Sequence, residues 1–362
     1  MFRFILLSLI FYACSSNSNT EQEVNEIHIE PVVENLTIPW ALAFLPNGDH
    51  LITEKEGKIL WHKQADPPDK FTEVQGVPEV YDGGQGGLMD LVLHPDFQKT
   101  PWVYLTYSIS KDGKKTTRVS RALWDNGALK NLQVLFTAEP WFRRNIHFGS
   151  RLVFDSKGYM FFTVGDRGNR DLAQDLSTHN GKVFRLHDDG SIPKDNPFVS
   201  RNNAMKEIWS YGHRNPQGLV LKGEELWAHE HGPRGGDEIN LIQKGKNYGW
   251  PVITYGKEYI GGSIGEGVTK KGVENPKKYY IPSIAPCGMA YYNGDLFPKW
   301  KNSFFSGSLV LRHLNRVSAQ DLSEEERLLS SLEKRFREVR VGPDGFIYFS
   351  VEEGAIYRIV PK

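Results

Sequence analysis

The chain has 362 residues, of which 44 are basic, 44 are acidic, 39% are hydrophobic and two are cysteines. This composition is that of a folded globular protein, and the balanced charge argues against nucleic acid as a partner. At this length, a soluble chain either divides into several domains or repeats one structural unit around an axis.

The first 13 residues have the features of a signal peptide. Arg3 supplies a positive charge, residues 4–12 are almost entirely apolar, and Ala13 precedes Cys14. The apolar stretch is too short to span a bilayer. A small residue before a cysteine resembles a bacterial lipoprotein signal. We therefore expect Cys14 to carry a lipid, which would be the only membrane contact, and residues 14–25 to form a disordered tether.

The alternative is an ordinary secretory signal with an incidental cysteine. Either signal exports the protein, so we expect it in the periplasm, the outer membrane or at the cell surface. If Cys14 is lipidated, Cys287 has no cysteine partner, and packing must hold the fold without a disulfide.

From about residue 26 onwards, short apolar runs alternate with Gly, Pro, Asn and Asp clusters, and no segment keeps a helical period. This pattern predicts an all-β fold. An apolar strand, a turn of the Pro-Asn-Gly type and a second apolar strand recur in six copies, which begin near residues 42, 91, 152, 218, 288 and 339. A spacing of roughly 50 to 70 residues fits four-stranded propeller blades with loop insertions.

We therefore predict that residues 26–362 form a single six-bladed β-propeller. A ring of blades must close, and residues 26–36 are strand-like. Pairing this segment with the last blade would remove both exposed edges. The alternative fold, two packed β-sandwiches, does not account for the recurring turn.

The loops of a propeller surround one mouth of its channel, so functional residues are expected between the repeated strands. In the run GGQGGL (residues 83–88), Gln85 lies among glycines that let the backbone approach a ligand closely. His147 comes immediately before a predicted strand, and Asp166 lies at that strand's far end. A histidine can accept a proton from a substrate, and a carboxylate on its other nitrogen would fix the tautomer. The competing interpretations are a flexible turn and a structural histidine.

Three further loop segments carry charge. Arg214 and Asn215 lie in a loop fixed by Gly and Pro, which suits an oxygen-rich anion. The run HGPRGGDEIN (residues 231–240) mixes exposed carbonyls with carboxylates, as calcium prefers, although it lacks the spacing of an EF-hand. Arg335 and Arg337, two residues apart on an extended strand, would point the same way and could clamp a polycarboxylate. The structural alternatives are a turn between blades with Arg214 paired to a carboxylate, and a solvated edge for Arg335 and Arg337.

Taken together, these segments resemble the pyrroloquinoline quinone (PQQ)-dependent soluble aldose sugar dehydrogenases, relatives of soluble quinoprotein glucose dehydrogenase, over residues 36–359. The most specific matches are GQGGL (84–88), HFGSRL (147–152), GDRG (165–168), GHRNPQG (212–218) and HGPRGGDEIN (231–240). The resemblance implies a six-bladed propeller that binds PQQ and calcium and oxidises aldoses to lactones.

The resemblance also implies roles for individual residues. His147 would take the proton of the anomeric hydroxyl while hydride passes to the quinone, Asp166 would orient His147, and Arg214 would lie beside the quinone oxygen. The remaining roles are cofactor or substrate contact (Gln85, Asn215), calcium binding through carbonyls (Gly232, Pro233), binding of cofactor carboxylates (Arg335, Arg337) and a second calcium position (Glu238 with the carbonyl of Tyr248).

One position departs from the family pattern. A lysine that contacts the quinone follows a Ser-Leu or Ala-Leu pair in the fifth repeat of the family, whereas Val310 follows Ser308-Leu309 here. Arg312 would face the same side of a strand as Val310 and could replace the lost cation, although a guanidinium is not equivalent to an ammonium.

The leading hypothesis is therefore an exported PQQ- and calcium-dependent aldose dehydrogenase. One alternative is a non-catalytic propeller that binds a sugar or a protein at the same mouth. The other is a calcium-bound hydrolase, such as a lactonase, which would need activated water instead of a redox group. The particular sugar, the electron acceptor and the oligomeric state are left open by the sequence.

Overall fold

The structure is a computed structural model that describes residues 27–362. The predicted signal peptide (1–13) and tether (14–25), including Cys14, lie outside the described residues. Within residues 27–362, no helix is long and apolar enough to cross a membrane. In the same part of the chain, Cys287 is a buried free thiol.

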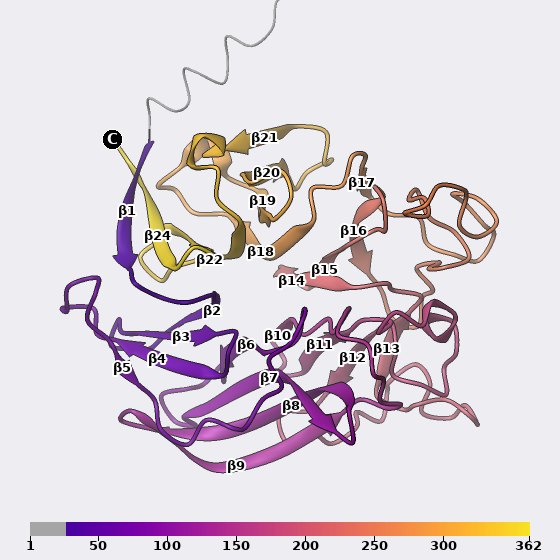
Figure 1. Ribbon diagram of the computed structural model, residues 1–362, viewed down its shortest axis with the longest axis horizontal. Helices are drawn as coiled ribbons and strands as arrows, with labels where there is room; N and C mark the ends of the chain where they lie inside the picture. The colour runs from indigo at the N-terminus through magenta and orange to yellow at the C-terminus, as the bar shows by residue number, and fades with distance from the viewer. Residues whose placement is uncertain (1–26) are drawn as a thin grey trace, which may run out of the picture.

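The described chain folds into six four-stranded antiparallel sheets arranged as the blades of a ring (Figure 1). The first blade consists of β2 (Pro39–Phe44), β3 (His50–Glu54), β4 (Lys58–His62) and β5 (Thr72–Glu73). The second consists of β6 (Leu88–Leu93), β7 (Trp102–Lys111), β8 (Lys114–Asp125) and β9 (Ala128–Thr137). The third consists of β10 (Leu152–Phe154), β11 (Met160–Val164), β12 (Lys182–Leu186) and β13 (Ile208–Tyr211).

The last three blades repeat this order. The fourth blade consists of β14 (Pro216–Lys222), β15 (Glu225–Glu230), β16 (Asp237–Ile242) and β17 (Lys278–Tyr280). The fifth consists of β18 (Pro286–Tyr292), β19 (Ser303–Ser308), β20 (Leu314–Ser318) and β21 (Glu325–Leu328). The sixth consists of β22 (Phe336–Val341), β23 (Ile347–Val351), β24 (Ala355–Pro361) and β1 (Ile27–Val33). Three short 3₁₀ turns, η1 (Arg170–Ala173), η2 (Pro298–Trp300) and η3 (Ser330–Leu332), lie in connections between these strands.

The ring is closed by its first strand. β1 pairs antiparallel with β24, from Ile27 opposite Pro361 to Val33 opposite Ile356. This pairing confirms the expected closure and the six-bladed propeller. Two packed sandwiches are excluded because each sheet has only four strands and packs against the next one around the ring.

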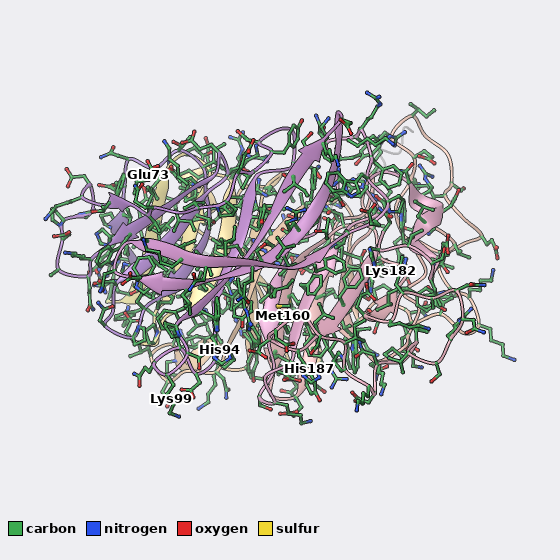
Figure 2. The ribbon with its side chains drawn as sticks, turned by 90° about the horizontal axis from the view of Figure 1, so that it is seen from below. Glu73, His94, Lys99, Met160, Lys182 and His187 are labelled. Atoms are coloured by element: carbon green, nitrogen blue, oxygen red, sulfur yellow. The ribbon has the colours of Figure 1, made fainter. Side chains whose placement is uncertain are left out.

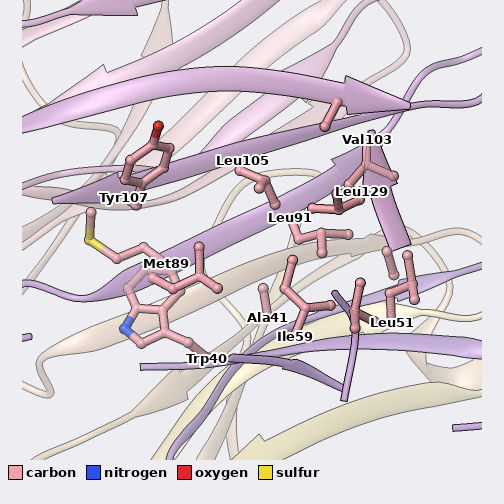
Figure 3. Packing of buried hydrophobic residues seen from close by; sticks show 14 of the residues in the cluster. Trp40, Ala41, Leu51, Ile59, Met89, Leu91, Val103, Leu105, Tyr107 and Leu129 are labelled. Carbon is pink, nitrogen blue, oxygen red and sulfur yellow. The ribbon is translucent and has the colours of Figure 1, made fainter. Parts of the chain in front are cut away.

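The core lies between neighbouring blades. Inner strands such as β3, β11 and β12 are buried at every position, as expected for strands covered on both faces. In the cluster between the first two blades, Trp40, Leu51 and Ile59 pack against Met89 and Leu105 (Figure 3). Each blade therefore buries its apolar side chains on its neighbours, which explains how a long chain forms one ring.

One face of the ring gathers the loops that matter for function. The first strands of neighbouring blades contact one another and so line the centre. Because successive strands are antiparallel, the connection from the second to the third strand and the connection to the next blade lie at the same end. Figure 2 shows the ring turned by 90° from the view of Figure 1.

Candidate functional site

The predicted site residues lie at that one end of the ring. Gln85 and His147 are on connections between blades, Asp166 is on the connection between β11 and β12, and Arg214 is on the connection between β13 and β14. The same end carries Asn215, Gly232, Pro233, Arg312 and Arg335. The topology therefore brings together segments that are far apart in the sequence.

His147 and Asp166 form a buried pair on this face. Nδ1 of His147 lies 2.6 Å from Oδ1 of Asp166, and the two residues are 8% and 1% exposed. Gly165 allows the close approach of the two loops, since a Cβ there would lie 2.3 Å from the carbonyl oxygen of His147. The contact orients the imidazole and leaves its Nε2 as the nitrogen that can take up a proton.

The electrostatics of the pair favour a neutral histidine next to an ionised carboxylate. Burial lowers the pKa of His147, and the charge of Arg214 acts in the same direction, while Asp166 opposes both. Burial by itself would raise the pKa of Asp166, but the hydrogen bond from His147 and the charge of Arg214 hold it below its ordinary value. A neutral imidazole of this kind can act as a base.

Gln85 supports the histidine from the other side. Oε1 of Gln85 accepts a hydrogen bond from the backbone N–H of His147 at 2.7 Å. The backbone N–H of Gln85 donates to the carbonyl of Asn145 at 2.8 Å. The glycines beside it serve close packing within the protein, since a Cβ on Gly87 would lie 2.2 Å from the carbonyl oxygen of Lys55. The side-chain oxygen of Gln85 thus holds the backbone of the predicted base.

Arg214 is buried beside the pair. Its Nη1 donates to the carbonyls of His231 at 3.1 Å and Gly232 at 3.0 Å, and its carbonyl accepts the N–H of Asp166 at 2.8 Å. Glu230 fixes the start of this loop, because Oε2 accepts the N–H of Arg214 at 2.6 Å. The guanidinium is therefore held rigidly near the predicted base.

Asn215 is 1% exposed, and its side-chain oxygen is already used. Oδ1 accepts the N–H of Gly149 at 3.2 Å and Nε2 of Gln217 at 3.3 Å. The side-chain oxygen of Asn215 thus holds the backbone between His147 and β10 in place. The sequence did not suggest this contact.

The loop from Gly232 to Gly236 is folded by Asp237. Oδ1 of Asp237 accepts the N–H of Gly232 at 2.9 Å, and Oδ2 accepts the hydroxyl of Ser283 at 2.6 Å and the N–H of Ile284 at 2.8 Å. Asp237 is thus occupied by the protein itself. The carbonyl oxygens of Gly232 and Pro233 remain the oxygen ligands that this loop could offer to a cation.

Glu238 lies deeper than expected for a surface ligand. It is 9% exposed, and burial together with the nearby Glu230 raises its pKa well above the ordinary value. Nδ2 of Asn240 lies between these two carboxylates, at 3.3 Å from Glu230 and 3.2 Å from Glu238. The phenol of Tyr248 donates to the carbonyl of Leu241 at 2.6 Å.

A buried carboxylate without a cationic partner favours a proton or a metal ion. The structure as described from residue 27 contains no group of three or more His, Cys, Asp or Glu side chains that could hold a metal. This finding concerns side chains, whereas the predicted calcium ligands are mainly backbone carbonyl oxygens.

Arg335 and Arg337 converge, as predicted, but on a carboxylate of the protein. Both guanidinium groups form ion pairs with Glu352, on the connection after β23. The backbone is not a regular strand here, because β22 begins at Phe336 and its register shifts between Phe336 and Glu338. Nε of Arg337 is buried and has no hydrogen-bond acceptor in the described chain.

The prediction for Arg312 is wrong in its geometry. β19 ends at Ser308 and β20 begins at Leu314, so Val310 and Arg312 lie in a turn and not on one strand. Arg312 has a positive φ of 53°, is exposed, and donates to the carbonyl of Glu333 at 3.3 Å. Because a turn reverses the chain, the alternation of side chains that the prediction assumed does not apply.

The sequence did not point to Trp250, Glu230 as an orienting group, or Glu352. Trp250 lies in the long connection between β16 and β17, and its Nε1 donates to Oδ2 of Asp166 at 2.8 Å. Nothing in the sequence links residues 84 positions apart. Glu230 lies next to the quoted HGPRGGDEIN run, but its carboxylate is directed to His213 and Arg214.

Comparisons with known proteins agree with this geometry. The family model described as glucose / sorbosone dehydrogenase matches residues 36–358. The chain belongs to this family. Among curated proteins, this family member is 42% identical over 347 residues to the aldose sugar dehydrogenase YliI of Escherichia coli (strain K12), and the match covers 93% of each chain.

Solved structures resemble this glucose / sorbosone dehydrogenase family member over nearly all its length. The apo-form of the soluble aldose sugar dehydrogenase of Escherichia coli superposes with a TM-score of 0.89 at 42% identity, covering 93% of this chain and 100% of the other. The PQQ-bound aldose sugar dehydrogenase of Streptomyces coelicolor superposes with a TM-score of 0.76 at 26% identity, covering 93% and 99%.

Proposed function

We propose that this protein oxidises the anomeric C–OH of aldose sugars to lactones, with PQQ and calcium as resident groups. The observation that carries the proposal is the buried His147–Asp166 pair next to Arg214, at the mouth where the loops of all blades meet. The aldose sugar dehydrogenases named above support the substrate class.

His147 acts as the base. Its Nδ1 is engaged by Asp166, so Nε2 takes the proton of the sugar's anomeric hydroxyl, and the ionised Asp166 stabilises the imidazolium that forms. PQQ, when bound, would be the two-electron acceptor for the hydride of the anomeric carbon. Loss of this hydride and of the hydroxyl proton would leave that carbon as the lactone carbonyl.

The surrounding donors fit a cofactor with several carboxylates. Three guanidinium groups, those of Arg214, Arg335 and Arg337, lie on or next to the loops of this face. Glu352 is the carboxylate that faces Arg335 and Arg337, and Nε of Arg337 has no acceptor among residues 27–362. A ligand carboxylate would satisfy this buried donor. Arg312 is an exposed cation that could add to this binding.

Calcium would be held by carbonyl oxygens of Gly232 and Pro233. The bond from Arg214 uses one lone pair of the Gly232 oxygen, and a carbonyl oxygen has two, so one stays free for a cation. The ion would polarise the bound cofactor as a Lewis acid. We assign the second calcium position to buried Glu238 with the carbonyl of Tyr248, because a divalent cation would neutralise this desolvated carboxylate.

The test is dye-linked oxidation of a panel of aldoses by the purified protein, with and without added PQQ and calcium. We expect turnover only when both are present. His147→Gln should lower kcat by about 100- to 10,000-fold, the usual contribution of a general base. His179→Gln is the matched control, because His179 is also buried and lies 2.8 Å from a carboxylate, Glu207, without a role in the proposal.

Other outcomes would favour the alternatives. Saturable binding of PQQ or sugar without turnover would indicate a non-catalytic propeller. Hydrolysis of lactones in the absence of PQQ would indicate a calcium-dependent hydrolase. Equal loss of turnover in His147→Gln and His179→Gln would contradict the role of His147 as base.

A further inference from the structure

The second oxygen of Asp166 is engaged by a residue that no motif contains. Oδ1 of Asp166 accepts the bond from His147 and the N–H of Gly168 at 2.6 Å. Oδ2 accepts the indole N–H of Trp250 at 2.8 Å. All three contacts are buried or nearly so, and Asp166 itself is 1% exposed. The carboxylate is therefore oriented from both of its oxygens.

The position of the indole is itself fixed by several segments. The backbone N–H of Trp250 donates to the carbonyl of Gly212 at 2.9 Å, and its carbonyl accepts Nε2 of Gln174 at 2.7 Å. Its ring faces the guanidinium groups of Arg214 and Arg170, at 5.4 and 5.6 Å from the ring centroid. Trp250 thus connects the long β16–β17 connection to the loops that carry Asp166 and Arg214.

We propose that Trp250 is a positioning residue of the His147–Asp166 pair, whose indole N–H holds Asp166 ionised and in the rotamer that orients His147. The proposal rests on the function proposed above and extends it to a segment outside every recognised motif. Its physical basis is that a buried carboxylate oxygen without a donor is costly. Without the indole N–H, more of the negative charge of Asp166 would lie on Oδ1, next to His147. His147 would then hold its second proton more tightly, and its pKa would rise.

Other charged groups around the pair have to be considered in any pH measurement. Arg214 and Arg167 lower the pKa of His147 through their charges, and Arg214 also acts on Asp166. His231 stays neutral over the working range, because burial lowers its pKa to about 3. Arg170 forms an ion pair with Glu258 at 2.6 Å. Benzothienylalanine at residue 250 would remove only the indole N–H and leave these groups in place, whereas Trp250→Phe also shortens the ring that faces Arg214 and Arg170.

The experiment compares Trp250→Phe with a matched control, Trp209→Phe. The indole N–H of Trp209 is buried and has no acceptor within the described part of the chain, and its ring also faces a guanidinium, that of Arg185, at 5.0 Å. The titration of His147 is followed by NMR on the apo protein with labelled histidine, and the His147 resonance is assigned by its loss in His147→Gln.

Trp250→Phe should raise the apparent pKa of the pair by about one to two pH units, the equivalent of one hydrogen bond to a charged group. Trp209→Phe should leave it unchanged. In the loaded enzyme, the acidic limb of the kcat/KM profile should move upward by the same amount. A role in packing alone would lower activity at every pH without moving this limb.

If Trp250→Phe does not fold, the N–H can be removed without a change of shape by placing benzothienylalanine at residue 250. A folded variant of either kind with an unshifted His147 titration overturns the inference. Because the NMR titration needs neither PQQ nor sugar, a shift in a protein without sugar oxidation would reject the proposed function and leave the role of Trp250 standing.

Discussion

Three buried histidines of the described chain face a carboxylate, and their surroundings distinguish them. His147 lies 2.6 Å from Asp166, His179 lies 2.8 Å from Glu207 and His213 lies 2.8 Å from Glu230. The His213 side chain is fully buried, with Ser210 at its second nitrogen. The second nitrogen of His179 accepts the N–H of Glu139 at 2.8 Å. Of these three, His147 keeps a ring nitrogen without such a partner.

A different histidine pair makes stability depend on pH. Nδ1 of His50 lies 3.1 Å from Nδ1 of His62, and Nε2 of His62 lies 3.4 Å from the carbonyl of Pro67. A carbonyl only accepts, so His62 carries its proton on Nε2 and His50 donates from Nδ1. Burial and the neighbouring His62 lower the pKa of His50 from 6.5 to about 4.

Because the folded state binds this proton less tightly than the unfolded state, the free energy of unfolding should fall as the pH drops from about 6.5 towards about 4. His50→Gln can still donate to His62 but does not titrate. We expect the wild type to lose stability relative to His50→Gln across this window, measured by urea unfolding at several pH values. Parallel curves for the two proteins would contradict the assignment.

At the scale of elements, the connection between β11 and β12 is the one that carries Asp166, Arg170 and Gln174. It is anchored by Lys182 on β12, a residue labelled in Figure 2. Nζ of Lys182 is buried and donates to the carbonyls of Leu172 at 2.8 Å, Ala173 at 3.1 Å and Asn180 at 2.6 Å. One ammonium thus uses all three of its donors to fold the loop.

Lys182→Met should therefore lower the free energy of unfolding by at least about 2 kcal/mol, because three buried carbonyls lose their donor. It should also reduce sugar oxidation, since the loop that holds Asp166 is loosened. Lys157→Met is the control, because Lys157 is on the same blade and its side chain is 68% exposed. Thermal unfolding of both variants measures the effect, and equal midpoints would contradict the role of Lys182.

At the scale of the whole molecule, closure of the ring depends on β1, which is 7 residues long. Val33 is fully buried in the cluster that joins the first and last blades, together with Leu42, Ile52, Tyr348 and Ile356. The seam therefore has a core of its own, in addition to the backbone pairing of β1 with β24.

Val33→Ala should lower the free energy of unfolding by about 2 kcal/mol, since it leaves a cavity at this seam. Glu34→Ala, at the exposed neighbouring position, should change it by less than about 0.5 kcal/mol. Urea unfolding followed by tryptophan fluorescence measures both. A cost of Val33→Ala no larger than that of Glu34→Ala would mean that the seam contributes little to stability.

Much of this molecule could be predicted from its sequence. The recurring turns and apolar runs predicted six blades and the closing strand, because strand periodicity and turn chemistry are local properties of the chain. The loop motifs predicted the His147–Asp166 pair, since Gly-rich loops between repeats meet at one mouth of a propeller. The spacing of Arg335 and Arg337, two residues apart, predicted that their side chains converge.

The tertiary structure decided two things: which residues far apart in the sequence contact one another, and where the backbone forms an irregular turn. Arg312 lies in a turn, where the alternation of a strand is lost. Asp237, Asn215 and Gln85 hold backbone groups of neighbouring loops, which depends on how the blades are placed. Trp250 reaches Asp166 from another blade. A local pattern determines the element that a residue forms, but only packing of the blades determines which polar groups meet.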